Sequence, residues 1–272
     1  KTKGYALAND ETTAIEIGDE PMQFHMKFPD IPVAVGEERL DAIPQLLHDR
    51  PDTQAVILDD AFQHRIINAG LNILLSDSGN LFTSDFFLPT GDLRDQRRSY
   101  KRAHIIVVTK CRPDLSPEER TKICKEINPL PHQKIFFTKI SYGVPYHLTT
   151  HDFRFIDEKT EVLLVTGIAN PRPLKLFLEE RVETYYMMSY NDHHIFSILD
   201  WKDIKKRFEN IRAEKKIILT TEKDAMRLLK FSQEMNGMPF YVLPIEHSFL
   251  FNQQNEFNET VIQFIQNFKH PD

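Results

Sequence analysis

The sequence predicts an α/β fold built around a largely parallel sheet, and three observations support that prediction. Short apolar runs rich in β-branched residues recur along the chain, as expected for strands buried on both faces. Segments with helical periodicity separate these runs. Strands that alternate with helices indicate parallel pairing through crossover connections.

The order of elements also predicts a division of the chain. The expected strands are residues 55–58, 72–75, 105–108, 134–137, 162–165, 217–219 and 241–243. The expected helices are residues 37–48, 117–127, 173–180, 201–212, 222–231 and 256–268. A stretch around residues 143–160 contains Gly143 and Pro145 and lacks helical periodicity, which indicates a boundary. We therefore expect two α/β domains, residues 1–150 and residues 151–272.

Length, charge and cysteine content argue against several classes of function. The chain has 272 residues, enough to bury a substantial core. Its formal net charge of -6 argues against a nucleic-acid partner, because such proteins are usually basic. Cys111 and Cys124 are too few for a disulfide framework, so we expect reduced thiols. No apolar run approaches the roughly 20 residues that a membrane-spanning helix needs.

An apolar run that ends in two carboxylates is the strongest local feature. Residues 55–58 lead directly into Asp59 and Asp60, and Gln63 and His64 follow. Ligands of open α/β sheets bind beyond the carboxyl ends of strands, and Mg²⁺ prefers hard oxygen ligands. The pattern therefore indicates a magnesium site of the kind found in P-loop enzymes. The two acids could instead cap a turn or helix, and both interpretations stay open here.

Two further segments carry candidate acid–base groups. Residues 18–21 place Asp19 and Glu20 before a proline that disfavours a helical conformation at Glu20. A carboxylate on such a turn could act as a general base, although a charged surface turn is the simpler interpretation. Residues 191–194 contain His193, whose neutral imidazole could accept a proton, orient a carboxylate or bind metal. A helix cap with exposed histidines is the alternative.

A positively charged segment follows residues 88–93. Guanidinium groups bind phosphate bidentately, so the segment could clamp a phosphate, or it could face an anionic membrane surface. A solvated helix face is the simpler interpretation for its outer members. The basic residues are Arg94, Arg97, Arg98, Lys101 and Arg102.

Several sequence patterns of known chemistry are absent. No stretch reads G-x-x-x-x-G-K-[ST], so the backbone loop that cradles nucleotide phosphates does not occur in this sequence. Neither zinc-finger spacing nor a G-x-S-x-G nucleophile motif occurs. The chain begins at Lys1 rather than at an initiator methionine, so we expect a fragment whose missing part could have carried a membrane anchor.

Taken together, the motifs and their order resemble the tetraacyldisaccharide 4'-kinase family, the lipid A 4'-kinases of Gram-negative bacteria. The resemblance extends from about residue 5 to residue 250, and it depends on the order of the motifs rather than on any one of them. The matching segments are residues 18–21, 32–35 with Arg39, 58–64, 88–94, 166–171, 192–193 and 221–225.

The resemblance implies a P-loop NTPase-like kinase core, truncated at its N-terminus, plus a smaller α/β lobe, with the site in the cleft. It implies that Asp19 takes the proton of a sugar hydroxyl, that His193 orients Asp19, and that lobe closure brings the two together. The implied magnesium ligands are Asp59 and Asp60, with Gln63 nearby. The implied substrate- or nucleotide-binding residues are Glu20, Arg39, His64 and Arg94.

The implied activity is phosphorylation of the 4'-hydroxyl of a tetraacylated glucosamine disaccharide 1-phosphate with ATP and Mg²⁺. The implied location is the cytoplasmic face of the bacterial inner membrane, peripheral or anchored by an upstream segment. The expected partners are the lipid A precursor and the membrane surface, with no nucleic acid and no protein partner. We expect this chain alone to bind ATP weakly and to turn over little.

Some positions depart from the family pattern. Ala61 stands where the family usually has glycine, Thr90 where it has alanine, Asp92 where it has proline, and Asp95 where it often has glutamate. The shorter acid at residue 95 makes a direct contact there doubtful. His194 is not a reliable family position, so His193 is preferred.

Two other functions are compatible with these residues. A metal-dependent phosphoesterase could use Asp59, Asp60 and His193 around a two-metal site. A non-catalytic module that binds glycolipid or nucleotide is the third possibility, and it predicts that removing Asp19 leaves function intact.

Overall fold

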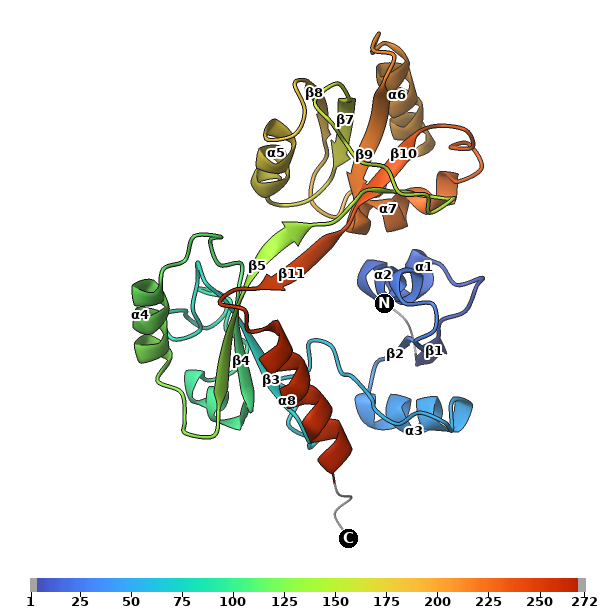
Figure 1. Cartoon of the computed structure of the whole chain (residues 1–272). Coiled ribbons are helices and arrows are strands. Elements are labelled where there is room, and N and C mark those ends of the chain that lie inside the picture. The colour runs from blue at the N-terminus through green and yellow to red at the C-terminus, as the bar shows by residue number, and fades with distance from the viewer. Residues whose placement is uncertain (1–3, 269–272) are drawn as a thin grey trace. The chain divides into compact units, whose positions relative to one another are not determined.

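The computed structural model describes residues 4–268, and the chain forms two compact units (Figure 1). Unit 1 combines Lys1–Pro51 with Tyr142–Ile245. Unit 2 combines Asp52–Ser141 with Glu246–Asp272. The chain therefore passes from one unit to the other three times.

These units differ from the two consecutive domains expected from the sequence. The N-terminal residues Ala8, Ile17 and Met22 are buried in the same apolar cluster as Phe196 and Trp201. At the other end, the C-terminal helix packs onto the sheet of unit 2. The burial of apolar side chains, rather than their order along the chain, therefore decides which segments form one unit.

The main sheet of unit 1 has the strand order β6-β10-β9-β7-β8. Strand β7 pairs in parallel with β8 and β9, β9 pairs in parallel with β10, and β6 is antiparallel at the edge. The strands are β6 (Tyr146–His147), β7 (Glu161–Thr166), β8 (Tyr185–Ser189), β9 (Lys216–Thr221) and β10 (Phe240–Leu243).

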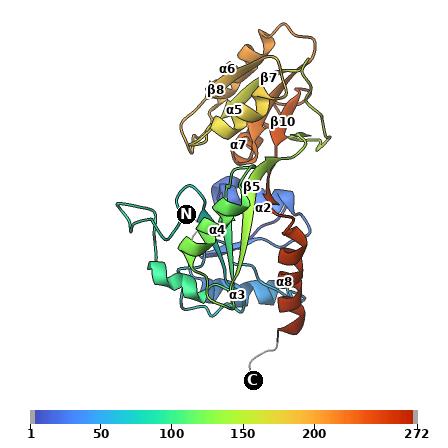
Figure 2. The same ribbon diagram turned by 60° about the vertical axis from the view of Figure 1, so that its left-hand side comes forward.

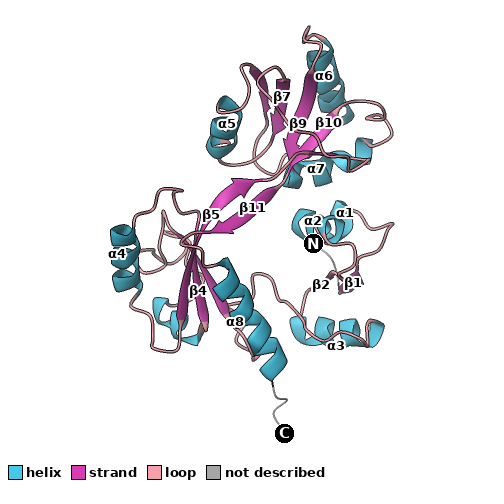
Figure 3. Ribbon diagram, in the orientation of Figure 1, coloured by secondary structure: helices cyan, strands magenta, loops and turns pink. Residues whose placement is uncertain are grey.

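Apolar clusters cover both faces of this sheet. Leu163 and Val165 of β7 belong to one cluster, and Val162 and Leu164 belong to another. All four side chains are fully buried, as the continuous apolar run predicted. The covering helices are α5 (Arg172–Glu179), α6 (Ile198–Glu209) and α7 (Glu222–Leu228), and the short 3₁₀ helix Leu229–Phe231 follows α7 (Figure 3).

The N-terminal part of unit 1 is a small helical layer beside a two-stranded antiparallel ribbon. The ribbon consists of β1 (Tyr5–Leu7) and β2 (Ala34–Gly36). The helices are α1 (Ala14–Ile17), α2 (Asp19–Lys27) and α3 (Arg39–Asp49). Helix α2 lies against α7, which brings the N-terminal segment to the end of the main sheet.

Unit 2 contains a four-stranded sheet in the order β11-β5-β4-β3. Strands β3, β4 and β5 are parallel neighbours. Helix α8 runs beside this sheet (Figure 2). Its Phe257 and Val261 pack against the cluster that contains Phe136 of the sheet. The elements are β3 (Ile73–Asp77), the 3₁₀ helix Arg97–Arg102, β4 (Ile105–Thr109), α4 (Pro117–Ile127), β5 (Lys134–Tyr142), β11 (Ile245–Phe249) and α8 (Gln254–Asn267).

The predicted α/β class and all the predicted helices are confirmed, whereas the strand predicted at residues 55–58 is wrong. That segment has no regular secondary structure, and within residues 4–268 it pairs with no other strand. The side chain of Ile57 is 92% exposed. A strand needs partners for its backbone N–H and C=O groups, and this run has none in the described chain.

The turn predicted at residues 18–21 is also wrong, because α2 begins at Asp19. Pro21 lies in the first turn of the helix, where backbone N–H groups have no intrahelical acceptor, so a proline is tolerated. Gly18 precedes the helix with φ 98°, a conformation that favours glycine. The sequence analysis also missed β1, β2, β6, β8, β11 and α1.

Candidate active site

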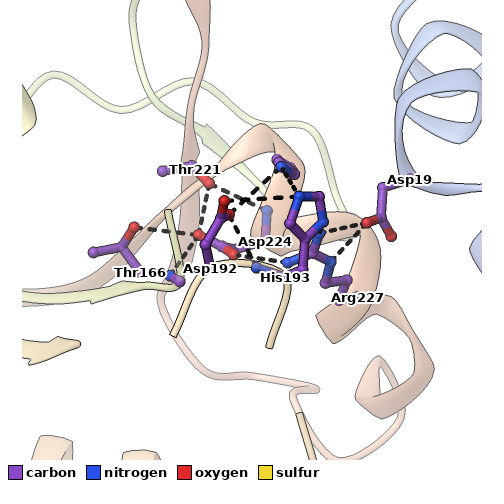
Figure 4. A network of polar contacts seen from close by, with 9 residues as sticks. Asp19, Thr166, Asp192, His193, Thr221, Asp224 and Arg227 are labelled. Atoms are coloured by element: carbon purple, nitrogen blue, oxygen red, sulfur yellow. Dashed lines mark hydrogen bonds and ion pairs between the residues drawn. The ribbon is translucent and has the colours of Figure 1, made fainter. Parts of the chain in front are cut away.

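Asp19 lies at the start of α2 and faces Arg227 of α7 (Figure 4). The Nε and Nη2 atoms of Arg227 donate to the same carboxylate oxygen, Oδ2, at 2.8 and 2.5 Å. The Arg227 side chain is only 7% exposed, whereas that of Asp19 is 24% exposed. The carboxylate therefore reaches the surface while a buried guanidinium holds it from behind.

His193 lies beside the same arginine. Its Nδ1 is 3.1 Å from Arg227 Nη2, and its Nε2 is 3.3 Å from Lys223 Nζ. The backbone at His193 is left-handed, with φ 61°, and its N–H donates to the Asp192 carboxylate at 2.9 Å. Asp192 also lies 3.7 Å from Lys223 Nζ. The loop thus presents the imidazole to two cationic side chains of α7.

Asp19 and His193 were expected in different lobes, but both belong to unit 1. Within residues 4–268 no hydrogen bond joins them directly, and Arg227 contacts both. Neither Arg227 nor Lys223 was among the predicted site residues, although Lys223 lies in the motif at residues 221–225. Their spacing of four residues, which places two side chains on one helix face, was the available signal.

A buried carboxylate anchors α7 beneath these groups. Asp224 is fully buried, and its Oδ2 accepts from the Thr221 hydroxyl at 2.8 Å, the Gly167 N–H at 2.9 Å and the Thr166 hydroxyl at 3.2 Å (Figure 4). Thr221 in turn accepts from the Asp224 N–H at 3.1 Å and so caps the start of α7. A Cβ at Gly167 would approach the Asn191 carbonyl to 3.0 Å, so the close packing favours glycine.

A second buried acid ties α7 to α2. Glu222 is 3% exposed, and it accepts from Lys27 Nζ at 3.0 Å and from the Ile245 N–H at 3.0 Å. The helices that carry Asp19 and Arg227 are therefore linked at a second point.

Three other candidates in unit 1 lie outside this network. Glu20 is exposed and Arg39, the first residue of α3, is half-buried. Neither side chain makes a hydrogen bond or ion pair within the described residues. His194 turns away from the site, because its Nε2 lies 3.2 Å from Asp200 and its ring stacks on Tyr190.

In unit 2 the structure brings Asp60, Gln63 and Arg94 together. Arg94 binds both carboxylate oxygens of Asp60, with 2.7 Å from Nη1 to Oδ2. The hydrogen bond to Asp60 raises the pKa of Arg94 above its ordinary value. Gln63 Nε2 donates to the Asp60 carbonyl at 3.1 Å. Asp59 and His64 are exposed beside them.

The basic segment after Arg94 is held by internal contacts. Asp95 accepts from Arg65 and Arg102, each at 2.8 Å, and Arg97 Nε donates to the Asp85 carbonyl at 3.0 Å. Burial opposes the charge of Asp95, but the Gln96 N–H and the adjacent Arg65 hold the pKa of Asp95 below its usual value. The shorter acid at residue 95 thus contacts two arginines.

The residues around Asp59 fit a magnesium ion in the chemistry of their donors. No cluster of three or more His, Cys, Asp or Glu side chains in residues 4–268 could hold a metal by itself. Mg²⁺ usually takes one or two carboxylates and completes its shell with water and substrate phosphates. Because Arg94 occupies the Asp60 carboxylate, Asp59 is the more accessible of the two candidate ligands.

A parallel α/β framework that gathers carboxylates and arginines outside its sheets is typical of enzymes that act on phosphorylated substrates. Residues 1–266 match the family LpxK, tetraacyldisaccharide-1-P 4'-kinase. The chain belongs to this family.

Individual relatives agree with that assignment. The chain is 42% identical over 274 residues to a tetraacyldisaccharide 4'-kinase of Bacteroides fragilis, covering 97% of this chain and 73% of the relative. It is 39% identical over 272 residues to that of Flavobacterium johnsoniae, covering 100% and 77%. The fold is similar to that of LpxK from Aquifex aeolicus, crystallised in complex with ATP, with a TM-score of 0.70, 21% identity, and coverage of 97% and 76%.

Proposed function

We propose that this chain belongs to an enzyme that transfers the γ-phosphate of ATP to the 4'-hydroxyl of a tetraacylated glucosamine disaccharide 1-phosphate, in lipid A biosynthesis. The observation that carries the proposal is the family match over residues 1–266. The partly exposed Asp19 carboxylate, held by a buried arginine, supports it because a base must reach a substrate hydroxyl.

Asp19 accepts the proton of the attacking hydroxyl in this proposal, and His193 assists it. Asp59 and Asp60 would hold Mg²⁺, with Gln63 supporting the Asp60 backbone. The ion would neutralise charge on the phosphate oxygens of ATP. Arg94, bound to Asp60, would place a second positive charge near the transferring group, since phosphoryl transfer depends mainly on alignment and charge stabilisation.

The remaining assignments concern substrate binding and location. Glu20 and Arg39 would contact the sugar substrate or its phosphate, and His64 the nucleotide. No helix within the described residues is long and apolar enough to cross a membrane. We propose that the enzyme works at the cytoplasmic face of the inner membrane, because its acyl-chain-bearing substrate resides in a bilayer.

The phosphoesterase alternative gains no support. It requires His193 as a metal ligand, whereas both ring nitrogens of His193 face cationic donors, Arg227 and Lys223.

The test is transfer of labelled γ-phosphate from ATP to the tetraacylated disaccharide 1-phosphate in mixed micelles, using the full-length gene product. Asp19→Asn and Asp59→Asn should each lower the rate by at least about 10²-fold, the usual contribution of a positioned base or metal ligand. Asp30→Asn, at an exposed carboxylate outside the site, is the matched control. Transfer that persists in the Asp19 variant would contradict the assigned base. No transfer by the folded wild-type protein would contradict the proposed reaction.

A further inference from the structure

We propose that Arg227 is the positioning residue of the catalytic base, holding Oδ2 of Asp19 so that Oδ1 is the atom that accepts the hydroxyl proton. The inference rests on the proposed kinase function and names a residue to which no motif assigned a role. It also changes the expected part of His193, whose effect on Asp19 would pass through the guanidinium.

The contact geometry distinguishes the two oxygens of the carboxylate. Both donors of Arg227, Nε at 2.8 Å and Nη2 at 2.5 Å, converge on Oδ2. Within residues 4–268, Oδ1 of Asp19 makes no hydrogen bond. An acceptor that already receives two charge-assisted hydrogen bonds binds a further proton less readily. Oδ1 is therefore the oxygen available to a substrate hydroxyl.

The guanidinium is itself held in place. Its side chain is 7% exposed on a short helix that Asp224 and Glu222 anchor. Asp224 Oδ1 lies 3.7 Å from Arg227 Nη1, so the far side of the guanidinium faces a buried negative charge. A planar fork fixed in this way transmits its orientation to the carboxylate that it binds.

His193 meets this arginine rather than Asp19. A neutral imidazole has one acceptor nitrogen and one N–H, while arginine and lysine side chains only donate. His193 faces donors at both ring nitrogens, Arg227 at 3.1 Å and Lys223 at 3.3 Å, so it can accept from only one of them at a time. When His193 accepts from Arg227, it restrains the same Nη2 that donates to Asp19.

The transfer breaks two bonds and forms two. The hydroxyl O–H bond breaks and its proton moves to Asp19 Oδ1, while the oxygen forms a bond to the γ-phosphorus of ATP. The bond between that phosphorus and the bridging oxygen breaks, and its electron pair leaves with ADP. Arg227 stays protonated throughout, because guanidinium does not give up its proton in proteins.

The experiment measures kcat and KM of the full-length gene product for Arg227→Met, Arg227→Lys, His193→Ala and the double variant Arg227→Met/His193→Ala. We expect kcat of Arg227→Met to fall about 10²-fold, the loss typical of a misplaced catalytic group, with the KM for MgATP within about twofold of wild type. Arg227→Lys keeps the positive charge but loses the planar guanidinium, so its kcat should lie between those of Arg227→Met and the wild type. Arg181→Met is the matched control, because Arg181 pairs with the exposed Glu180 just after α5 and its replacement should leave kcat unchanged.

The double variant gives the readout that a purely structural role would not produce. If His193 acts through Arg227, the kcat of the double variant should lie within about threefold of the kcat of Arg227→Met. The effects of residues that act as a unit are not additive. A loss of kcat in the double variant equal to the product of the two single losses would overturn the inference. A wild-type kcat in Arg227→Met would also overturn it. If Arg227→Met does not fold, wild-type kcat in Arg227→Lys overturns the inference in the same way. An inactive wild-type enzyme would instead refute the proposed function.

Discussion

Replacing Asp224 by alanine should strongly destabilise unit 1. The substitution removes the acceptor of three hydrogen bonds, from Thr166, Gly167 and Thr221, at a position with no exposure to solvent. It also removes the negative charge beside buried Arg227. Removing one partner of a buried charged pair typically costs about 3–5 kcal/mol, and we expect a loss of free energy of unfolding in that range.

Urea unfolding followed by tryptophan fluorescence measures this loss directly. The chain contains one tryptophan, and Trp201 is 3% exposed in the core of unit 1, so its emission reports on that unit. With an m-value of about 2 kcal/mol per M, the transition midpoint should fall by roughly 1.5–2.5 M. Asp224→Asn keeps the shape and one acceptor, so it should lose less.

Asp203→Ala is the control for this experiment, because Asp203 is exposed on α6 and its removal should change stability by less than about 0.5 kcal/mol. A loss below about 1 kcal/mol in Asp224→Ala, the size of one ordinary hydrogen bond, would refute the reasoning. It would mean that water or a rearranged side chain satisfies the three donors.

Three further outcomes are expected. Thr221→Ala removes the cap of α7 and should cost about 0.5–2 kcal/mol in the same Trp201 assay, whereas an unchanged midpoint would show that the cap contributes nothing. Burial, with Lys110 nearby, holds the pKa of His247 below its ordinary value of 6.5, so the unfolded chain binds more protons and unit 2 should lose stability as pH falls through about 6.5. His247→Gln should flatten that dependence in circular dichroism melts, and an equal slope in both proteins would contradict the assignment. Asp59→Asn should raise the Mg²⁺ concentration for half-maximal transfer about 10-fold or more relative to Asp30→Asn, and equal Mg²⁺ requirements would remove Asp59 from the metal site.

Local patterns predicted much of the framework, because they record which side chains must be buried. The apolar run at residues 162–165 became the central strand β7 and is buried on both faces, as predicted. The helix at 117–127 begins and ends where it was expected, and Ser116 caps it. The ordered motifs indicated the kinase family, and the family match confirms it.

The same local reasoning failed where structure depends on a distant partner. Residues 55–58 have the composition of a strand, yet they pair with nothing in the described chain, and Ile57 is exposed. The division into consecutive domains failed for a related reason. Apolar residues near the N-terminus are buried against helices almost 200 positions away, and no local pattern records that contact.

The sequence by itself determined the α/β class, most helices, the kinase family and the identity of the candidate base, since periodicity and motif order are local properties of the chain. Only the tertiary structure decided how that base is held. Asp19 and Arg227 are 208 positions apart, and Arg227 and His193 are 34 apart. Asp19 and Arg227 meet because α2 packs on α7 and buried Asp224 anchors α7. The spacing of residues along the chain does not predict this packing.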